Sequence, residues 1–454
     1  MRGRHSNNIR DMRFIMREIT VPWGAEKLSL KVPLSWELIY PESSNRTSKR
    51  KISELKIVAD ALQKPAGSPP IEKMKLRGKK IVIVTDDNTR PTPVSRYLHL
   101  VLGALKKGGA SMKNVLIIPA LGIHTPMFED EMAVKAGSKN LDEVMWENHN
   151  AFDKEKNAYF GTTKRGTPVY LNKHLSDAGL IILLGMTEPH LWAGFGGGMK
   201  NILPGLASVE TIGIHHTIIT EPPYQFNRVG MAPEKNSFRL DLEEVQGMIP
   251  SPIFSLNVVL DHDGRIKGAF AGDPVASHRE AVAFNISESG LKLDRQVDAV
   301  IVNSNPMDIN FKQGMKCVGN SLPALKPGGV VMAFMMAERG IDDIIVPEKA
   351  KPLWLVKGIL RAIGPSRVLK FLEKVRKGMN VEEKFLLYYS MQLMREHDLY
   401  FHVPTLSEDE IKRLGFFKHS YKPQEIIDMA SKQISKDARV AVFPNGGATF
   451  PVIE

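Results

Sequence analysis

Residues 179–185 read Gly-Leu-Ile-Ile-Leu-Leu-Gly, and the chain continues to residue 200 with Met-Thr-Glu-Pro-His-Leu-Trp-Ala-Gly-Phe-Gly-Gly-Gly-Met-Lys. The first seven residues are apolar or glycine, which predicts a buried strand of a parallel sheet. Residues that follow the carboxyl end of such a strand lie where open α/β sheets hold their ligands. We therefore expect a binding site within residues 186–200.

The glycine cluster at 196–198 lets backbone N–H groups approach an anion, and a helix after it would direct its positive end toward a phosphate. Lys200 adds a positive charge, or a nucleophilic amine if its pKa is lowered. Taken alone, these residues fit a glycine-rich loop with one solvated lysine equally well. His190 before the cluster and the pair His215 and His216 after it favour a site.

Strands and helices alternate on both sides of this stretch. Apolar runs at 80–85 and 115–119 are each followed by a helical pattern, and a second alternation begins at 298–303. This is the pattern of an α/β protein, and we predict two α/β domains with mainly parallel sheets and a cleft between them. Residues 13–33 predict a hairpin, and Gly364-Pro365 predicts a break in a helix-rich region at 350–400.

We place a domain boundary near residue 290. The predicted N-terminal domain spans 1–290 and is rejoined by the tail 438–454, and the predicted C-terminal domain spans 291–437. In this scheme the N-terminal domain holds the main binding site and the C-terminal domain closes over the bound molecule.

Composition narrows the possible partners and compartment. The formal net charge of +11 is spread over helices and loops without an RNA-binding motif, so we expect an anionic small molecule and no nucleic acid. The basic residues of 351–377 predict a solvated helix face. No apolar run approaches the ~20 residues that a membrane helix needs, so we expect no membrane partner. Cys317 is the single cysteine, which excludes an intramolecular disulfide and indicates the cytoplasm.

Three junctions after predicted strands carry unusual polar groups. The first contains Asp87 and Arg90, the second His124, and the third His190 with Lys200. Seen alone, the first fits a helix cap with a surface ion pair, and a lone loop histidine is more often structural than catalytic. If all three loops line one crevice, the two histidines face each other across a bound molecule, and two opposed bases suggest inversion of a stereocentre.

A further pair, Gln313 and Lys316, shares one helical face in the second alternation. The pair could hold a carboxylate over the cleft. An exposed amide and a solvated lysine is the more frequent explanation of two such residues.

These motifs together resemble the nickel-dependent lactate racemase family of 2-hydroxyacid racemases and epimerases. The order and spacing agree with the family pattern from about residue 15 onward. The matching motifs are Asp87-Asn-Thr-Arg-Pro91, Gly122-Ile-His124, Glu188-Pro-His190, Gly194-Phe-Gly-Gly-Gly-Met-Lys200, His216 and Gln313-Gly-Met-Lys316.

The resemblance implies a role for each matched residue and a cofactor, the nickel-pincer nucleotide, supplied by cofactor-biosynthesis enzymes. His216 is the implied protein ligand to nickel, and Lys200 lies at the cofactor thioamide. His124 and His190 are the implied acid/base pair. The implied binding residues are Asp87, Thr89, Gly196, Gly197 and Gly198 for ribose and phosphate, and Arg90, Gln313 and Lys316 for the substrate carboxylate.

The implied reaction is inversion at C2 of a 2-hydroxy acid by an isomerase. One histidine takes the hydroxyl proton while hydride passes to the pincer, and the ketone then receives hydride on its other face. This route avoids a carbanion beside a carboxylate, and the cofactor supplies the hard chemical step. Imidazole is a reasonable nickel ligand.

One departure from the lactate-specific pattern leaves the substrate open. Phe385 is the nearest aromatic to the position of a family tryptophan, so a longer aliphatic, aromatic, dicarboxylic or sugar acid is an alternative to lactate. His215 beside His216 leaves two possible nickel ligands. A one-way redox or elimination enzyme with the same cofactor, or a non-catalytic cofactor-binding protein, are the alternative functions.

Overall fold

The computed structural model describes residues 15–41, 53–221, 227–261, 263–341, 346, 348–350, 352–376, 378–379 and 381–453. The side chains of residues 220, 381, 382, 385 and 386 are outside this set. The prediction about Phe385 therefore falls outside the described residues.

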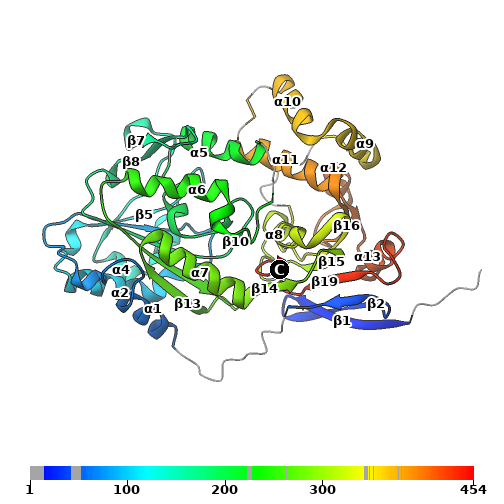
Figure 1. The fold of residues 1–454 in the computed structure, drawn as a ribbon, viewed down its shortest axis with the longest axis horizontal. Helices are drawn as coiled ribbons and strands as arrows, with labels where there is room; N and C mark the ends of the chain where they lie inside the picture. Colours follow the sequence, from blue (N-terminus) through cyan, green and yellow to red (C-terminus); the bar gives the residue numbers. More distant parts are fainter. Residues whose placement is uncertain are drawn as a thin grey trace, which may run out of the picture.

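The first half of the fold is a six-stranded sheet in the order β13-β12-β9-β4-β5-β6 (Figure 1). Its strands are β4 (Ile81–Thr85), β5 (Val115–Pro119), β6 (Met145–Trp146), β9 (Leu180–Met186), β12 (Ile253–Leu260) and β13 (Ile266–Gly272). Only β13 runs antiparallel to its neighbour. Every residue of β4, β5 and β9 is buried, as the apolar runs predict.

Helices cover both faces of this sheet. One face packs against α1 (Glu54–Gln63), α2 (Val94–Lys107) and α3 (Glu129–Ala136). The opposite face packs against the segments that carry the glycine cluster, together with α5 (Val209–His216) and α6 (Ser237–Glu244). A further helix, α7 (Pro274–Ser289), lies along β12 and β13.

The second half is a fully parallel six-stranded sheet in the order β18-β17-β16-β15-β19-β3. Its strands are β3 (Glu37–Ile39), β15 (Val297–Asn303), β16 (Leu325–Phe334), β17 (Asp398–His402), β18 (Lys418–His419) and β19 (Arg439–Phe443). The helices of this half are α8 (Phe311–Ser321), α9 (Leu353–Ile363), α10 (Pro365–Val375), α11 (Val381–Glu396), α12 (Glu408–Leu414) and α13 (Pro423–Ala430). The predicted α/β fold with mainly parallel sheets is confirmed, as is the break at Gly364-Pro365.

The two halves of the fold do not follow the predicted boundaries, which assign 1–290 and 438–454 to one domain and 291–437 to the other. The predicted hairpin forms as β1 (Met16–Trp23) and β2 (Glu26–Pro33), but it packs on the second sheet and against α13. β3 and β19 also belong to that sheet. Periodicity predicts that a segment is a strand without saying which sheet it joins, so the sequence placed these strands with the wrong neighbours.

The two halves meet where β14 (Gly290–Leu293) pairs in parallel with β20 (Phe450–Ile453). Beyond β19 the chain turns back toward the first half, and Phe450 packs edge-on against Phe195 with the ring centroids 5.3 Å apart. No helix in the described part of the chain has the length and apolarity needed to cross a bilayer.

Candidate active site

The carboxyl end of β4 holds an aspartate–histidine pair. Asp87 Oδ2 lies 2.6 Å from His124 Nδ1, and Oδ1 accepts hydrogen bonds from the backbone and hydroxyl of Thr89. Burial would raise the pKa of Asp87, but the hydrogen bond and charge of His124 and the bond from Thr89 outweigh it and hold the pKa at about 2. The ionised carboxylate fixes the proton of His124 on Nδ1, which leaves Nε2 to accept a proton.

A buried carboxylate lies among three cations in the next loop. Glu188, directly after β9, forms an ion pair with Arg90 at 2.7 Å. Burial raises the pKa of Glu188, but Lys316, Arg90 and Lys200 together lower it below its ordinary value. The structure thus brings Arg90, Lys200 and Lys316 together around Glu188, a residue to which the sequence assigned no role.

Lys316 comes from α8 of the second half, so the cluster joins both halves of the fold. Burial lowers the pKa of Lys316 to about 8 and that of Lys200 to about 7, with Arg90 adding to both shifts. A substantial fraction of Lys200 is therefore the neutral, nucleophilic amine near neutral pH. Gln313 lies one turn before Lys316 on the same helix, and its backbone N–H donates to Asn310 Oδ1.

The helix expected after the glycine cluster is absent from this position. Residues 198–201 form a four-residue 3₁₀ turn, and the next α-helix begins at Val209. The prediction of a helix end directed at a phosphate was wrong, because Leu203-Pro204 and the turns that follow end the helical geometry after one turn.

Two N–H groups of the glycine cluster are already paired within the protein. Gly196 donates to the carbonyl of Glu188 at 2.7 Å, and Gly198 donates to Asn257 Oδ1 at 2.8 Å. The N–H of Gly197 has no partner among the described residues. Gly197 has a φ of +78°, and a Cβ there would lie 2.7 Å from Asn257 Oδ1, so only glycine fits.

Two side chains that the sequence analysis did not identify hold the glycine cluster in its conformation. Arg239 on α6 is fully buried and donates to the carbonyls of Phe195 and Gly197. His278 on α7 donates to the carbonyl of Gly196 at 2.9 Å. Neither residue lies in a recognisable motif, and only the tertiary fold brings them to the loop.

His190 follows β9 and lies near the cation cluster. Its Nδ1 accepts the backbone N–H groups of Trp192 and Ala193 at 3.2 and 3.3 Å. Burial lowers the pKa of His190 well below its ordinary value, and the charges of Lys200, Arg90 and Lys316 lower it further. His190 is therefore neutral, with its proton on Nε2, when no anion is near.

His216 has the form of a metal ligand. Its Nδ1 lies 2.8 Å from the carbonyl of Ile212, which fixes the proton there and leaves the Nε2 lone pair unused. Burial lowers the pKa well below its ordinary value, and His215 and Lys200 add to the shift. Trp192 packs edge-on against both His216 and His190, at centroid distances of 5.1 and 5.9 Å.

His215 faces the protein interior instead. It has no exposed surface, and its Nε2 contacts the carbonyl of Phe238 at 3.2 Å. These contacts favour His216 over His215 as the ligand. Within the described residues there is no group of three or more His, Cys, Asp or Glu side chains arranged to hold a metal.

A pocket opens beside His216. One wall comes from the first half and the other from α10 and α11 of the second half. The lining residues are Gly213, His216, Thr217, Ile219, Ser366, Leu369, Lys370, Glu373, Lys384 and Tyr388.

Comparison with known proteins shows the family of this chain. Residues 23–226 match the family model described as the lactate racemase N-terminal domain. A lactate racemase from Thermoanaerobacterium thermosaccharolyticum is 33% identical over 320 residues, which cover 70% of this chain and 74% of that protein. The chain belongs to the lactate racemase family.

Two further similarities support this assignment. A lactate racemase from Lactiplantibacillus plantarum is 30% identical over 303 residues, covering 66% of this chain and 70% of that protein. The structure of the lactate racemase apoprotein from T. thermosaccharolyticum matches with a TM-score of 0.80 and 25% identity, over 96% of this chain and all of that chain. A Thermotoga maritima protein shares the fold at a TM-score of 0.59 and 20% identity, over 89% of this chain and 99% of that chain.

The electrostatics of the cluster predict the reactivity of Lys200. Acylation of Lys200 by acetic anhydride should rise with a midpoint near pH 7, and Glu188→Gln should lower that midpoint because Glu188 raises the pKa of Lys200. The measurement is peptide mass spectrometry of the protein after brief treatment at a series of pH values. Glu210→Gln, at an exposed position on α5, is the control and should leave the midpoint unchanged. A wild-type midpoint near the ordinary value of 10.5 would contradict the described burial.

Proposed function

We propose that this protein is a racemase that inverts C2 of lactate or a related 2-hydroxy acid and uses a nickel-pincer nucleotide. The observation that carries the proposal is the convergence of Arg90, Lys316 and His190 on one buried cluster. The Asp87–His124 pair lies near enough that the charge of Asp87 acts on Arg90 and Lys200. The two related lactate racemases supply the reaction class.

The residues present fit the proposed cofactor. His216 offers a neutral imidazole with a free Nε2, which is the form that binds a transition metal. Lys200 offers an amine with a pKa of about 7 for the thioamide. Gly197 offers one free N–H to the phosphate, whereas Gly196 and Gly198 contribute the shape of the loop rather than free donors.

Asp87 and Thr89 can still serve the ribose. A carboxylate has about four acceptor sites, and Asp87 uses three of them for Thr89 and His124. One acceptor site is left for a ribose hydroxyl. Asp87 would thus hold the nucleotide and orient His124 at once.

The charge of the cluster suits one substrate carboxylate. Glu188 neutralises only one of the three cations Arg90, Lys200 and Lys316 when all are charged. Arg90 and Lys316, with Gln313 one helical turn away, would bind the carboxylate, since a guanidinium and an ammonium both donate to carboxylate oxygens. Binding across α8 would also fix the second half of the fold against the first.

The two histidines would handle the hydroxyl proton. His124 presents Nε2 as a base, because Asp87 holds the Nδ1 proton and stabilises the imidazolium. The bound carboxylate would partly neutralise Arg90 and Lys316 and so raise the pKa of His190 toward the range in which it exchanges a proton. When bound, the nickel-pincer nucleotide supplies a reversible hydride acceptor for C2. A cytoplasmic setting is part of the proposal and is supported by the single, buried Cys317.

The decisive experiment uses protein produced together with the cofactor-making enzymes. Single enantiomers of lactate and of longer aliphatic, aromatic, dicarboxylic and sugar 2-hydroxy acids are incubated with it, and chiral chromatography follows the loss of optical purity. We expect inversion of at least one acid, lost on removal of nickel. No inversion of any acid by protein that carries nickel and nucleotide would exclude the racemase and favour one-way redox chemistry or cofactor carriage.

Substitution of either histidine tests the acid/base assignment. His124→Gln and His190→Gln should each lower the racemisation rate by roughly 10²–10⁴-fold, the usual contribution of a general acid or base. Nickel content and thermal unfolding should match those of the unmodified protein, which separates a chemical effect from loss of cofactor or fold. Full activity in either variant would remove that residue from the mechanism.

Nickel retention tests the ligand. His216→Ala should lose bound nickel, because its Nε2 is the proposed protein donor, while the circular dichroism spectrum stays unchanged. Metal analysis of the purified protein gives the stoichiometry. His99→Ala, at an exposed position on α2, serves as the matched control and should retain nickel. Unchanged nickel in His216→Ala would overturn the assignment.

A further inference from the structure

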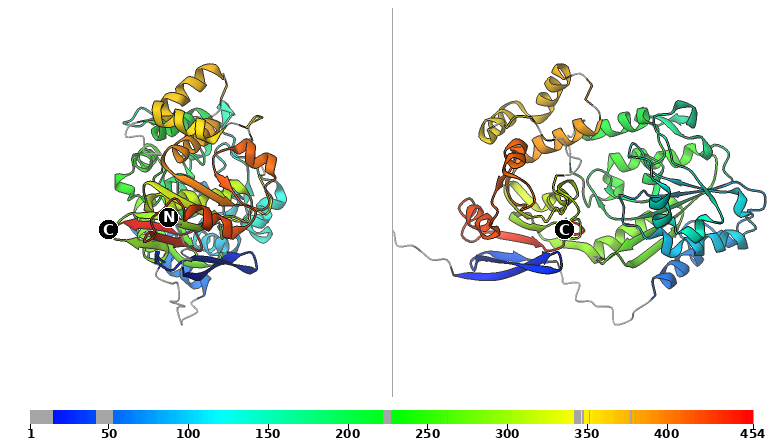
Figure 2. Two further views of the ribbon diagram at one scale, coloured as in Figure 1. Left: turned by 90° about the vertical axis from the view of Figure 1, so that its right-hand side faces the viewer. Right: turned by 180° about the vertical axis from the view of Figure 1, so that it is seen from behind.

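Two consecutive amphipathic helices, α9 and α10, form a helical hairpin that packs against α11 and lies above it in Figure 1; Figure 2 shows it from two further sides. We call these residues, 353–375, the α9–α10 hairpin. Its outer face is unusually apolar for an exposed surface. The exposed apolar side chains are Trp354, Leu355, Ile359, Ile363, Phe371 and Val375.

The spacing of these side chains makes them one surface on each helix. Leu355, Ile359 and Ile363 recur every four residues along α9, and Phe371 and Val375 do so along α10. Trp354 is 75% exposed, Phe371 64% and Val375 66%. A surface of this kind on a protein marks an interaction site more often than scattered apolar residues do.

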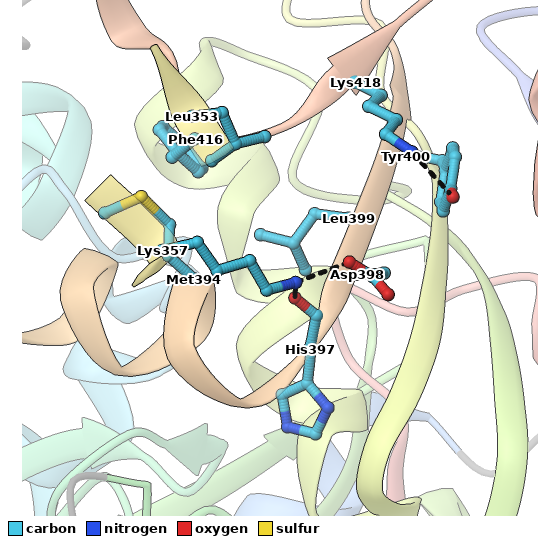
Figure 3. A pocket seen from close by; sticks show the side chains of 9 residues that line it. All are labelled: Leu353, Lys357, Met394, His397, Asp398, Leu399, Tyr400, Phe416 and Lys418. Carbon is cyan, nitrogen blue, oxygen red and sulfur yellow. Dashed lines mark hydrogen bonds and ion pairs between the residues drawn. The ribbon is translucent and has the colours of Figure 1, made fainter. Parts of the chain in front are cut away.

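The inner face of the hairpin is firmly attached, so the outer face is set by the fold. Lys357 Nζ donates to the carbonyl of His397 at 3.0 Å and pairs with Asp398, which ties α9 to the start of β17 (Figure 3). Leu360 and Leu369 are buried in the core of the second half. The apolar residues of the outer face therefore cannot turn inward without breaking these contacts.

Positive charge accompanies the apolar face. Arg361, Arg367 and Lys374 are exposed and have no hydrogen-bond or ion-pair partner among the described residues. Lys370 is also exposed, but it lines the pocket beside His216. The single carboxylate in the α9–α10 hairpin, Glu373, is paired with Lys384 at 3.1 Å. The outer face is thus cationic and apolar, without free negative charge of its own.

We propose that the α9–α10 hairpin docks on the surface of a bilayer that contains anionic phospholipid. Trp354, Phe371 and the aliphatic side chains would enter the boundary between headgroups and acyl chains, while the arginines and lysines bind the lipid phosphates. This assigns a partner to a basic segment that the sequence alone presented as a solvated helix face. It also departs from the expectation of no membrane partner, which considered only segments long enough to span a bilayer; a helix pair that lies on the surface needs no such segment.

A second copy of the chain and a nucleic acid both fit this face less well than an anionic lipid surface does. A second copy of the same face would place six unpaired cations together, three from each copy, with no anion between them. Nucleic acid would satisfy the cations, and bases could stack on Trp354 and Phe371, but the aliphatic side chains Leu355, Ile359 and Ile363 offer bases neither a stacking surface nor a hydrogen bond. A lipid surface accounts for both the aromatic and the aliphatic side chains.

The test is co-sedimentation of the full-length protein with vesicles of phosphatidylcholine alone or with about a third phosphatidylglycerol. We expect binding to the anionic vesicles that weakens with salt, and at least tenfold weaker binding to the neutral ones, since each juxtamembrane cation adds roughly a fivefold gain. The double variant Phe371→Ser with Val375→Ser should bind anionic vesicles at least about tenfold less tightly. Arg361→Glu with Arg367→Glu should abolish the preference for anionic lipid.

A matched control removes equally exposed apolar residues elsewhere. Phe152 and Val134 are 66% and 79% exposed on the first half, and Phe152→Ser with Val134→Ser should bind vesicles like the unmodified protein. Equal loss in this control would overturn the proposal, as would failure of the unmodified protein to bind anionic vesicles. A concentration-dependent dimer that Phe371→Ser with Val375→Ser disrupts in the absence of lipid would overturn it in favour of a second copy. Thermal unfolding of all variants verifies that they are folded.

Discussion

One buried carboxylate organises the functional part of this protein. Glu188 forms an ion pair with Arg90 and attracts Lys200, which follows the glycine cluster, and Lys316, which lies on α8 of the second half. Without it, three cations would lie together in a poorly solvated site, and their mutual repulsion would oppose closure of the two halves. The backbone carbonyl of the same residue accepts the N–H of Gly196, so Glu188 also fixes the start of the glycine cluster.

Much of the fold could be predicted from the sequence, because buried parallel strands are continuous apolar runs. The runs at 80–85, 115–119 and 179–185 became the centre of the first sheet, and the polar residues after them did meet at its carboxyl edge. Sheet membership could not be predicted in the same way. β3 and β19 join the second sheet through hydrogen bonds between segments far apart in the chain, and no local pattern encodes that pairing.

Some residues of the candidate site could be identified from the sequence, and others only from the fold. Residues in compact motifs, such as Asp87, Arg90 and Lys200, were visible because their type and spacing are unusual. Glu188 belongs to a matching motif, but the sequence could not predict that it is buried among cations from other segments. Arg239 and His278 were hidden, because a helical arginine and a helical histidine are ordinary until the fold aims them at the carbonyls of the glycine cluster. The α-helix expected after the glycine cluster does not form, because turns follow the 3₁₀ turn at 198–201 and end the helical geometry.

The contact between Phe195 and Phe450 has a consequence for the biogenesis of the protein. Both rings are fully buried, and they pack against Val229 and Val282 directly beside the glycine cluster. During synthesis, residues 195–200 leave the ribosome long before residue 450 exists, so one wall of their final environment is missing until the second sheet has been made. A nascent chain stopped after the first sheet could form its strands, but it would lack the packing that shapes the loop. The loop would therefore reach its final packing only after the C-terminal strand has been made.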